Sequence, residues 1–170
     1  VAIGEPFGYG PGEIKPGQMV SALREIGFDY IFDTDFSADL TIMEEGTELL
    51  ARLNRYLDGE KEALPILTSC CPAWVNFFET KYTDLLHIPS TARSPQQMMG
   101  PVIKNYFAEK IGVDRKDLVV VSIMPCLAKK MEADRAEFKV DGNPDVDIVL
   151  STRELARLIK RKDIQLGAMP

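Results

Sequence analysis

Histidine and cysteine are scarce in this sequence, and the scarcity excludes several kinds of site. The chain has one histidine, His87, and three cysteines among its 170 residues. Because it also lacks the CxxC pairs of the common structural zinc sites, a zinc centre of that type is not expected. An odd number of cysteines, in a chain large enough to bury a core, argues against a disulfide framework. We therefore expect reduced thiols with a catalytic or metal-binding role.

Basic charge and long apolar runs are also lacking. The net charge is −6, whereas a nucleic-acid surface requires clustered Lys and Arg. The one dense basic run, RELARLIKRK, is typical of a solvated helix face near a C-terminus. No apolar stretch approaches the ~20 residues that span a bilayer, and the first ten residues do not resemble a signal peptide. We expect no nucleic-acid or membrane partner and a cytoplasmic protein, with the periplasm left open because the N-terminus looks truncated.

Strand-like and helix-like segments alternate along the chain. This alternation predicts an α/β fold with a largely parallel β-sheet flanked by helices. We expect a single domain over 1–170 that is truncated at both ends, since the chain opens without methionine and ends at LGAMP. The predicted strands are 1–8, 28–32, 63–67, 117–123 and 146–150, and the predicted helices are 17–27, 37–57, 72–82, 94–112 and 151–160.

Three features define the ends of these predicted helices. Gly27 should end the first helix, and Pro101 should end or kink the helix over 94–112. Ser151 or Thr152 should cap the last helix, with Glu154 near its N-terminus.

The three cysteines directly follow two of the predicted strands. Cys70 and Cys71 come after 63–67, and Cys126 comes after 117–123. Ligands of open α/β sheets bind beyond the carboxyl ends of the strands, so the thiols should gather at one edge. Cys71 precedes a helix start at Pro72, whose positive end would favour a thiolate. Buried structural cysteines, a zinc site and an iron–sulfur cluster remain open, and a cluster would need thiolates from another segment or chain.

Two motifs resemble a known family. TSCCPAW at 68–74 and MPCLAKKMEADR at 124–135 resemble the first two signature motifs of the iron–iron hydrogenases, in their catalytic H-cluster domain. MEEGTELL, STARSPQQMMG and STRELARLIK also resemble that family, in the same order and at similar spacing, so the resemblance covers essentially the whole chain. It implies one lobe of a two-lobed catalytic domain and an enzyme that interconverts protons, electrons and dihydrogen.

The resemblance also implies the roles of individual residues. The family's H-cluster is a 4Fe–4S cluster bridged to a two-iron subcluster. Cys71 and Cys126 match ligands of the 4Fe–4S cluster, and Cys70 matches the thiol that passes protons. The implied proton path outward from that thiol consists of Glu45, Ser90 and Glu48, and the implied contacts to the two-iron subcluster are Lys129, Gln96 and Met124.

The two relay carboxylates have a simpler interpretation as well. Glu45 and Glu48 are three residues apart and share a helix face. Glu48 also stands four residues before Arg52, which is the spacing of a routine ion pair on a solvated helix. From the residues alone this second interpretation is favoured, and only the resemblance reverses the preference.

The family's third motif, with two further cysteine ligands, is absent from these residues. We therefore expect the isolated chain to be inactive, to bind no stable cluster, and to need the remaining C-terminal lobe. The implied partners are ferredoxin or another low-potential electron carrier and the hydrogenase maturation proteins. The alternatives are a non-catalytic or sensory hydrogenase relative, an iron–sulfur assembly factor of the same fold, and a plain thiol or zinc-binding α/β domain.

Overall fold

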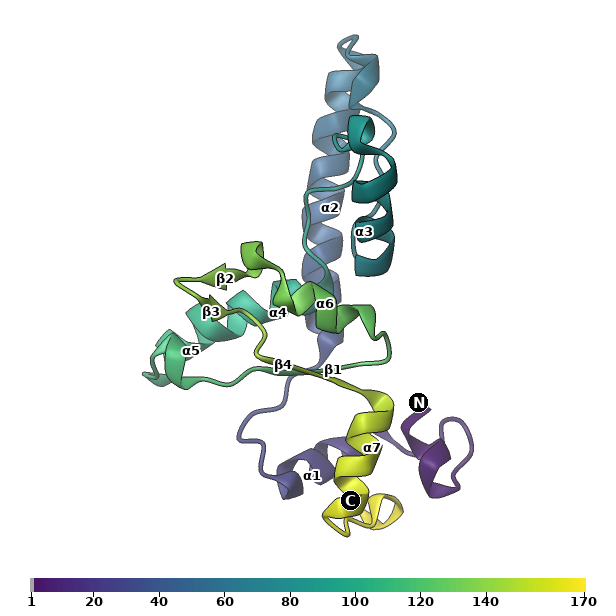
Figure 1. Ribbon diagram of the computed structural model, residues 1–170, viewed down its shortest axis with the longest axis vertical. Coiled ribbons are helices and arrows are strands. Elements are labelled where there is room, and N and C mark those ends of the chain that lie inside the picture. Colours follow the sequence, from purple (N-terminus) through teal and green to yellow (C-terminus); the bar gives the residue numbers. More distant parts are fainter. Residues whose placement is uncertain (1) are drawn as a thin grey trace.

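A pair of parallel strands lies at the centre of a mostly helical molecule (Figure 1). The computed structural model describes residues 2–170, without the side chain of Ala2. Strand β1 (Val121–Met124) pairs with β4 (Ile148–Ser151), with Val121 opposite Ile148. The helices are α1 (Pro16–Ile26), α2 (Thr34–Leu57), α3 (Pro72–Lys81), α4 (Pro95–Pro101), α5 (Ala108–Ile111), α6 (Ala128–Asp134) and α7 (Thr152–Arg161).

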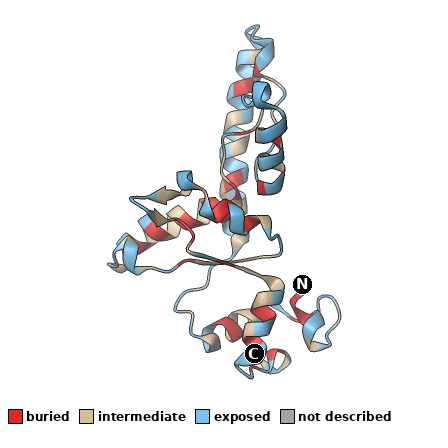
Figure 2. Ribbon diagram, in the orientation of Figure 1, coloured by how far each residue is buried: buried red, intermediate tan, exposed pale blue. Residues whose placement is uncertain are grey.

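Helices cover the strand pair on both faces. Helices α1 and α7 lie on one side of it and α4 and α6 on the other (Figure 1). Two apolar clusters result, and the buried residues concentrate there (Figure 2). The lower cluster includes Leu23 of α1 and Ile159 of α7, and the upper cluster is built from Val120, Ala133, Val146 and Val149.

The helix ends follow the local chemistry that the sequence predicts. Helix α1 ends before Gly27, whose φ of 115° is readily adopted only by glycine. Ser151 caps α7, and Glu154 completes a capping box with it. Helix α4 ends at Pro101, after which Val102–Phe107 form a π-helix. A proline inside a helix removes one backbone donor, so a change of hydrogen-bonding pattern at this point is expected.

The largely parallel sheet is a partly wrong prediction, because the parallel sheet has only two strands among residues 2–170. The predicted strand over 1–8 is a 3₁₀-helix at Ala2–Phe7, while Val1 lies outside the described residues. Residues 28–32 belong to no strand, and 63–67 form only an isolated bridge between Leu67 and Pro89. A strand requires a neighbouring backbone to exchange hydrogen bonds with, and apolar patterning alone does not supply one.

Helix α2 is long and projects away from the strand pair (Figure 1). Its base packs against α4, whereas α3 packs against α6. The predicted polar stretch after α6 contains a small antiparallel hairpin of β2 (Lys139–Val140) and β3 (Asn143–Pro144). None of the helices in residues 2–170 combines the length and apolar content required to cross a bilayer.

Candidate functional site

The cysteines lie on two loops that meet at Lys129. Cys71 is the N-cap residue of α3, directly before Pro72, and Cys126 lies between β1 and α6. The Lys129 Nζ donates to the carbonyl oxygen of Cys70 at 3.0 Å, and its backbone N–H donates to that of Cys126 at 3.3 Å. All three cysteines are exposed and free of disulfides. The structure thus brings the loops together, although residues 2–170 contain no group of three His, Cys, Asp or Glu side chains able to hold a metal.

Lys129 belongs to a buried, hydrogen-bonded polar cluster. Lys129 is 8% exposed, and its Nζ lies 3.0 Å from Oε2 of the buried Glu132. The same Glu132 oxygen accepts a hydrogen bond from Gln96 Nε2 at 3.1 Å. Gln96 Nε2 also lies 3.1 Å from the Lys129 carbonyl oxygen, and Gln96 Oε1 accepts from the Ser122 hydroxyl at 2.8 Å. Because each buried polar group has partners, the cluster holds the lysine in one position.

Sequence reasoning missed Glu132 and Ser122. Glu132 stands three residues after Lys129, which is the spacing of neighbours on one helix face. That spacing could have identified Glu132 as the anionic partner of the lysine. Ser122 lies on β1, 26 residues after Gln96 in the sequence. No local pattern links two residues that are so far apart.

Glu45 and Glu48 project from α2 towards two different loops. Glu45 Oε1 accepts a hydrogen bond from the backbone N–H of Ser69 at 3.3 Å, which sets its carboxylate beside the residue that precedes Cys70. Glu48 Oε2 accepts from the Ser90 hydroxyl at 2.8 Å. The two loops are tied together, since Ser90 N–H donates to the Leu67 carbonyl at 2.7 Å. One face of α2 therefore presents both carboxylates to the loops that carry Cys70 and Ser90.

Glu48 is also held by Arg52. The Arg52 Nη2 lies 2.6 Å from Glu48 Oε1, and the same guanidinium donates to the carbonyls of His87 and Pro89 at 2.9 and 3.1 Å. Burial by itself raises the pKa of Glu48, but the hydrogen bonds from Ser90, the backbone of Thr91 and Arg52 outweigh it and lower the pKa overall. The ion pair expected from the i,i+4 spacing and the contact with Ser90 thus exist together.

Met124 takes no part in this polar cluster. It ends β1 and packs against the upper apolar cluster of Val120, Val146 and Val149. Its position at the carboxyl end of β1 places it two residues before Cys126.

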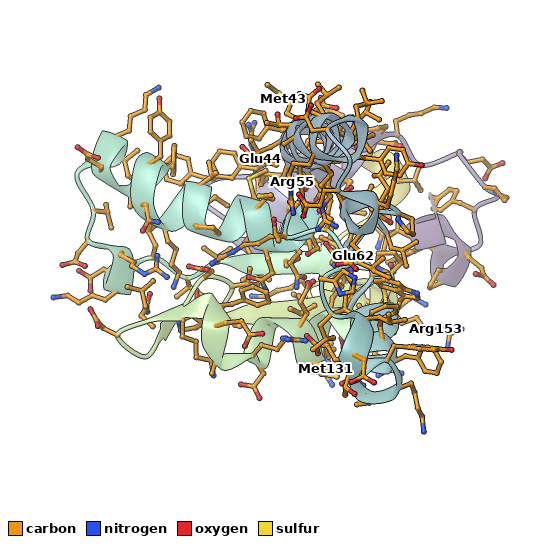
Figure 3. All side chains as sticks on the ribbon, turned by 90° about the horizontal axis from the view of Figure 1, so that it is seen from above. Met43, Glu44, Arg55, Glu62, Met131 and Arg153 are labelled. Carbon is orange, nitrogen blue, oxygen red and sulfur yellow. The ribbon has the colours of Figure 1, made fainter. Side chains whose placement is uncertain are left out.

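The side of α2 that faces away from the strands carries an exposed apolar side chain, Met43 (Figure 3).

Comparison with known proteins identifies what this arrangement resembles. All of residues 1–170 match the model of the family described as iron only hydrogenase large subunit, C-terminal domain. The chain is 59% identical to the NADP-reducing hydrogenase subunit HndD of Solidesulfovibrio fructosivorans over 170 residues, which is 99% of this chain and 29% of that protein. It is 46% identical to iron hydrogenase 1 of Clostridium pasteurianum over 168 residues, which is 99% of this chain and 28% of that protein.

A solved structure gives the same result. A variant of the FeFe-hydrogenase HydA1 from Chlamydomonas reinhardtii superposes with a TM-score of 0.96 at 47% identity, covering 100% of this chain and 42% of the other. A cytosolic Fe–S cluster assembly factor of Danio rerio is more distant, at 34% identity over 163 residues. The chain thus spans between about a quarter and two fifths of the length of the hydrogenases that it matches.

Proposed function

The chain belongs to the iron-only hydrogenase family, of whose large subunit it matches the C-terminal domain, and from this premise we propose that it is one lobe of a catalytic domain that interconverts protons, electrons and dihydrogen. The observation that carries the proposal is the pair of carboxylates on α2. Glu45 is hydrogen-bonded to the loop of Cys70, and Glu48 to Ser90. Ion pairing on a helix surface requires neither contact, whereas a proton path requires carboxylates close to the loops of Cys70 and Ser90.

The cysteine loops fit part of an H-cluster. Cys71 and Cys126 offer exposed thiols on loops joined through Lys129, and these two would be ligands of the 4Fe–4S cluster. When bound, the H-cluster supplies the redox chemistry of the reaction. The Lys129 ammonium is fixed by Glu132 beside the Cys70 carbonyl, where it would donate hydrogen bonds to an anionic ligand. The ligands that complete the set would come from the remaining C-terminal lobe.

The residues of this chain would move protons in a fixed order. Cys70 would exchange a proton at its Sγ with the Glu45 carboxylate, which the Ser69 N–H holds beside that loop. The Ser90 hydroxyl donates to Glu48, and a hydroxyl can accept one proton while it passes on another. Because the pKa of Glu48 is lowered, its carboxylate is ionised at neutral pH and would hold a proton passed from Ser90 only briefly. The Lys129 and Gln96 side chains of the buried cluster would have a positioning role.

The matched test uses three glutamates of α2 in the full-length protein. Glu45→Gln and Glu48→Gln should each lower dihydrogen turnover by about 100-fold or more at unchanged iron content, which is the usual contribution of a general acid or base. Glu44→Gln is the control, because Glu44 is exposed on the same helix and its side chain makes no hydrogen bond to either loop within residues 2–170. Wild-type turnover in both relay variants would overturn the proposal and leave Glu48 as a structural ion-pair partner of Arg52.

An exposed apolar stripe on α2 supports a partner lobe. Phe36, Met43, Leu50 and Leu57 recur every seven residues, and each is more than half exposed. A contiguous exposed row of this kind marks an interaction surface. We assign it to the part of the full-length protein outside this chain. Ferredoxin or another low-potential carrier as electron partner, and maturation proteins for cofactor insertion, are further parts of the proposal.

A further inference from the structure

Helix α3 carries Cys71 but takes no part in the two apolar clusters. Among residues 2–170, no side chain of α3 belongs to either cluster or packs against one. Phe78 is buried, but its ring lies against Trp74 of the same helix and Tyr82 directly after it, with ring centroids 5.0 and 5.2 Å apart. Such packing within one segment does not determine where that segment lies on the rest of the molecule. The polar links of α3 to its neighbour α6 are therefore important for its orientation.

Two polar links join α3 to α6, one at the start and one at the end of both helices. At the start, Lys129 in the first turn of α6 donates to the carbonyl oxygen of Cys70, two residues before α3 begins. At the end, Arg135 directly follows α6, and its Nη1 and Nη2 donate to Oε2 and Oε1 of Glu79 at 3.0 and 2.8 Å. In the described part of the chain, 70–81 has no other side-chain hydrogen bond to a different element.

The bond between Arg135 and Glu79 is directional. Two parallel N–H···O bonds hold the guanidinium and the carboxylate in one plane. Arg135 Nε is also hydrogen-bonded to Glu137, so the guanidinium is held on a second side. The Arg135 and Glu79 side chains are 27% and 39% exposed, so the pair should contribute little to global stability. Its main effect is geometric, because a helix held at one end can pivot and a helix held at both ends cannot.

We propose that Arg135 and Glu79 are positioning residues for the 4Fe–4S cluster. Their two-bond fork fixes the tilt of α3 on α6, and with it the separation of the Cys71 and Cys126 thiols. Cys71 is the N-cap residue of α3 and Cys126 stands two residues before α6, so each thiol moves with its helix. Ligands of a metal site must be held within about 0.5 Å of their productive geometry. The inference rests on the proposed function, which assigns these two thiols as cluster ligands.

Hydrogen exchange of the full-length protein tests the link between the helices. Glu79→Ala removes both acceptors of the fork. Glu137→Ala is the matched control, because it removes the other carboxylate on the same guanidinium and leaves the bond to α3 in place. Amides of α3 should exchange about fivefold faster in Glu79→Ala than in wild type or in Glu137→Ala. Unchanged exchange of α3 would overturn the proposal, and the measurement does not require the cluster or any turnover.

The electron paramagnetic resonance spectrum of the loaded full-length protein tests the positioning itself. Glu79→Ala should shift the g values of the reduced 4Fe–4S cluster and release iron to a chelator about fivefold faster than wild type, at an unchanged urea midpoint. Arg135→Lys keeps the charge but loses the fork, so it should change the spectrum in the same way, whereas Glu137→Ala should not.

The outcomes separate this inference from the proposed function. A wild-type spectrum and wild-type iron release in Glu79→Ala, even with faster exchange of α3, would overturn the positioning role. A large fall of the urea midpoint in Glu79→Ala would also overturn it and show that the pair acts on stability instead. Failure of the wild-type full-length protein to bind any 4Fe–4S cluster would contradict the proposed function, whereas the exchange measurement would still report on the link between α3 and α6.

Discussion

Lys129 is the residue at which the two cysteine loops and a buried carboxylate meet. Its ammonium lies between the Cys70 carbonyl and Glu132, and both Lys129 and Glu132 are buried. A lone buried ammonium would be costly, so Glu132 makes its position possible. The resemblance pointed to Lys129, but the chain itself provides the anion that holds it.

Glu132→Gln should destabilise the full-length protein by about 3 kcal/mol, because it leaves the Lys129 charge buried without its partner. Thermal or urea unfolding measures the loss. The double variant Lys129→Met/Glu132→Gln removes both charges and should recover part of it. Equal stability of Glu132→Gln and wild type would show that the ion pair does not hold Lys129.

Glu48 should make stability depend on acid pH. Its pKa lies below the ordinary value of about 4.5, so folding favours the ionised form. The stabilisation is fully present above the unfolded-state pKa and is lost as pH falls through the folded-state pKa. Urea midpoints of wild type should therefore fall more steeply below about pH 4.5 than those of Glu48→Gln. Parallel curves for the two proteins would contradict this, and Glu44→Gln should follow wild type.

At the scale of elements, the helix ends were predictable, whereas only the predicted strands 117–123 and 146–150 contain paired strands, β1 and β4, among residues 2–170. Gly27, Pro101 and Ser151 act within one turn of the chain, so their effects on α1, α4 and α7 could be read from neighbouring residues. Pairing of 28–32 depends on a backbone far away in sequence, and an apolar pattern does not reveal whether that backbone is within reach. Of the two predicted strands that precede the cysteines, only the one before Cys126 is a strand, β1, whereas 63–67 form an isolated bridge at Leu67.

The capping box of α7 gives a prediction at this scale. Ser151→Ala should destabilise the protein by about 1 kcal/mol, since the Glu154 N–H loses its acceptor at the helix start. Ser151→Thr keeps a hydroxyl that accepts from the Glu154 N–H and donates to the Glu154 carboxylate, so it should stay close to wild type in thermal unfolding. Equal unfolding temperatures of the alanine and threonine variants would show that the capping hydrogen bond does not stabilise the protein measurably.

At the scale of the molecule, the two opposite faces of α2 carry different side chains, carboxylates on one and exposed apolar residues on the other. Its inner face carries Glu45 and Glu48, and its outer row contains Met43 and Leu50, which are 69% and 63% exposed. Such a row should cause association when nothing covers it. We predict that the isolated 170-residue chain self-associates and that Met43→Glu/Leu50→Glu reduces this in sedimentation experiments. A monomeric wild-type chain at high concentration would contradict the assignment of this face to a partner lobe.

The most direct test of the proposed function is dihydrogen turnover of the full-length Cys70→Ser variant, measured together with its iron and sulfide content. Cys70 is exposed and directly follows Ser69, whose backbone N–H donates a hydrogen bond to Glu45. It is not assigned as a cluster ligand. The account predicts wild-type cluster content and loss of most turnover, because a hydroxyl is a far weaker acid than a thiol. Wild-type turnover in a fully loaded variant would contradict the proton path through Cys70, and with it the role assigned to this lobe.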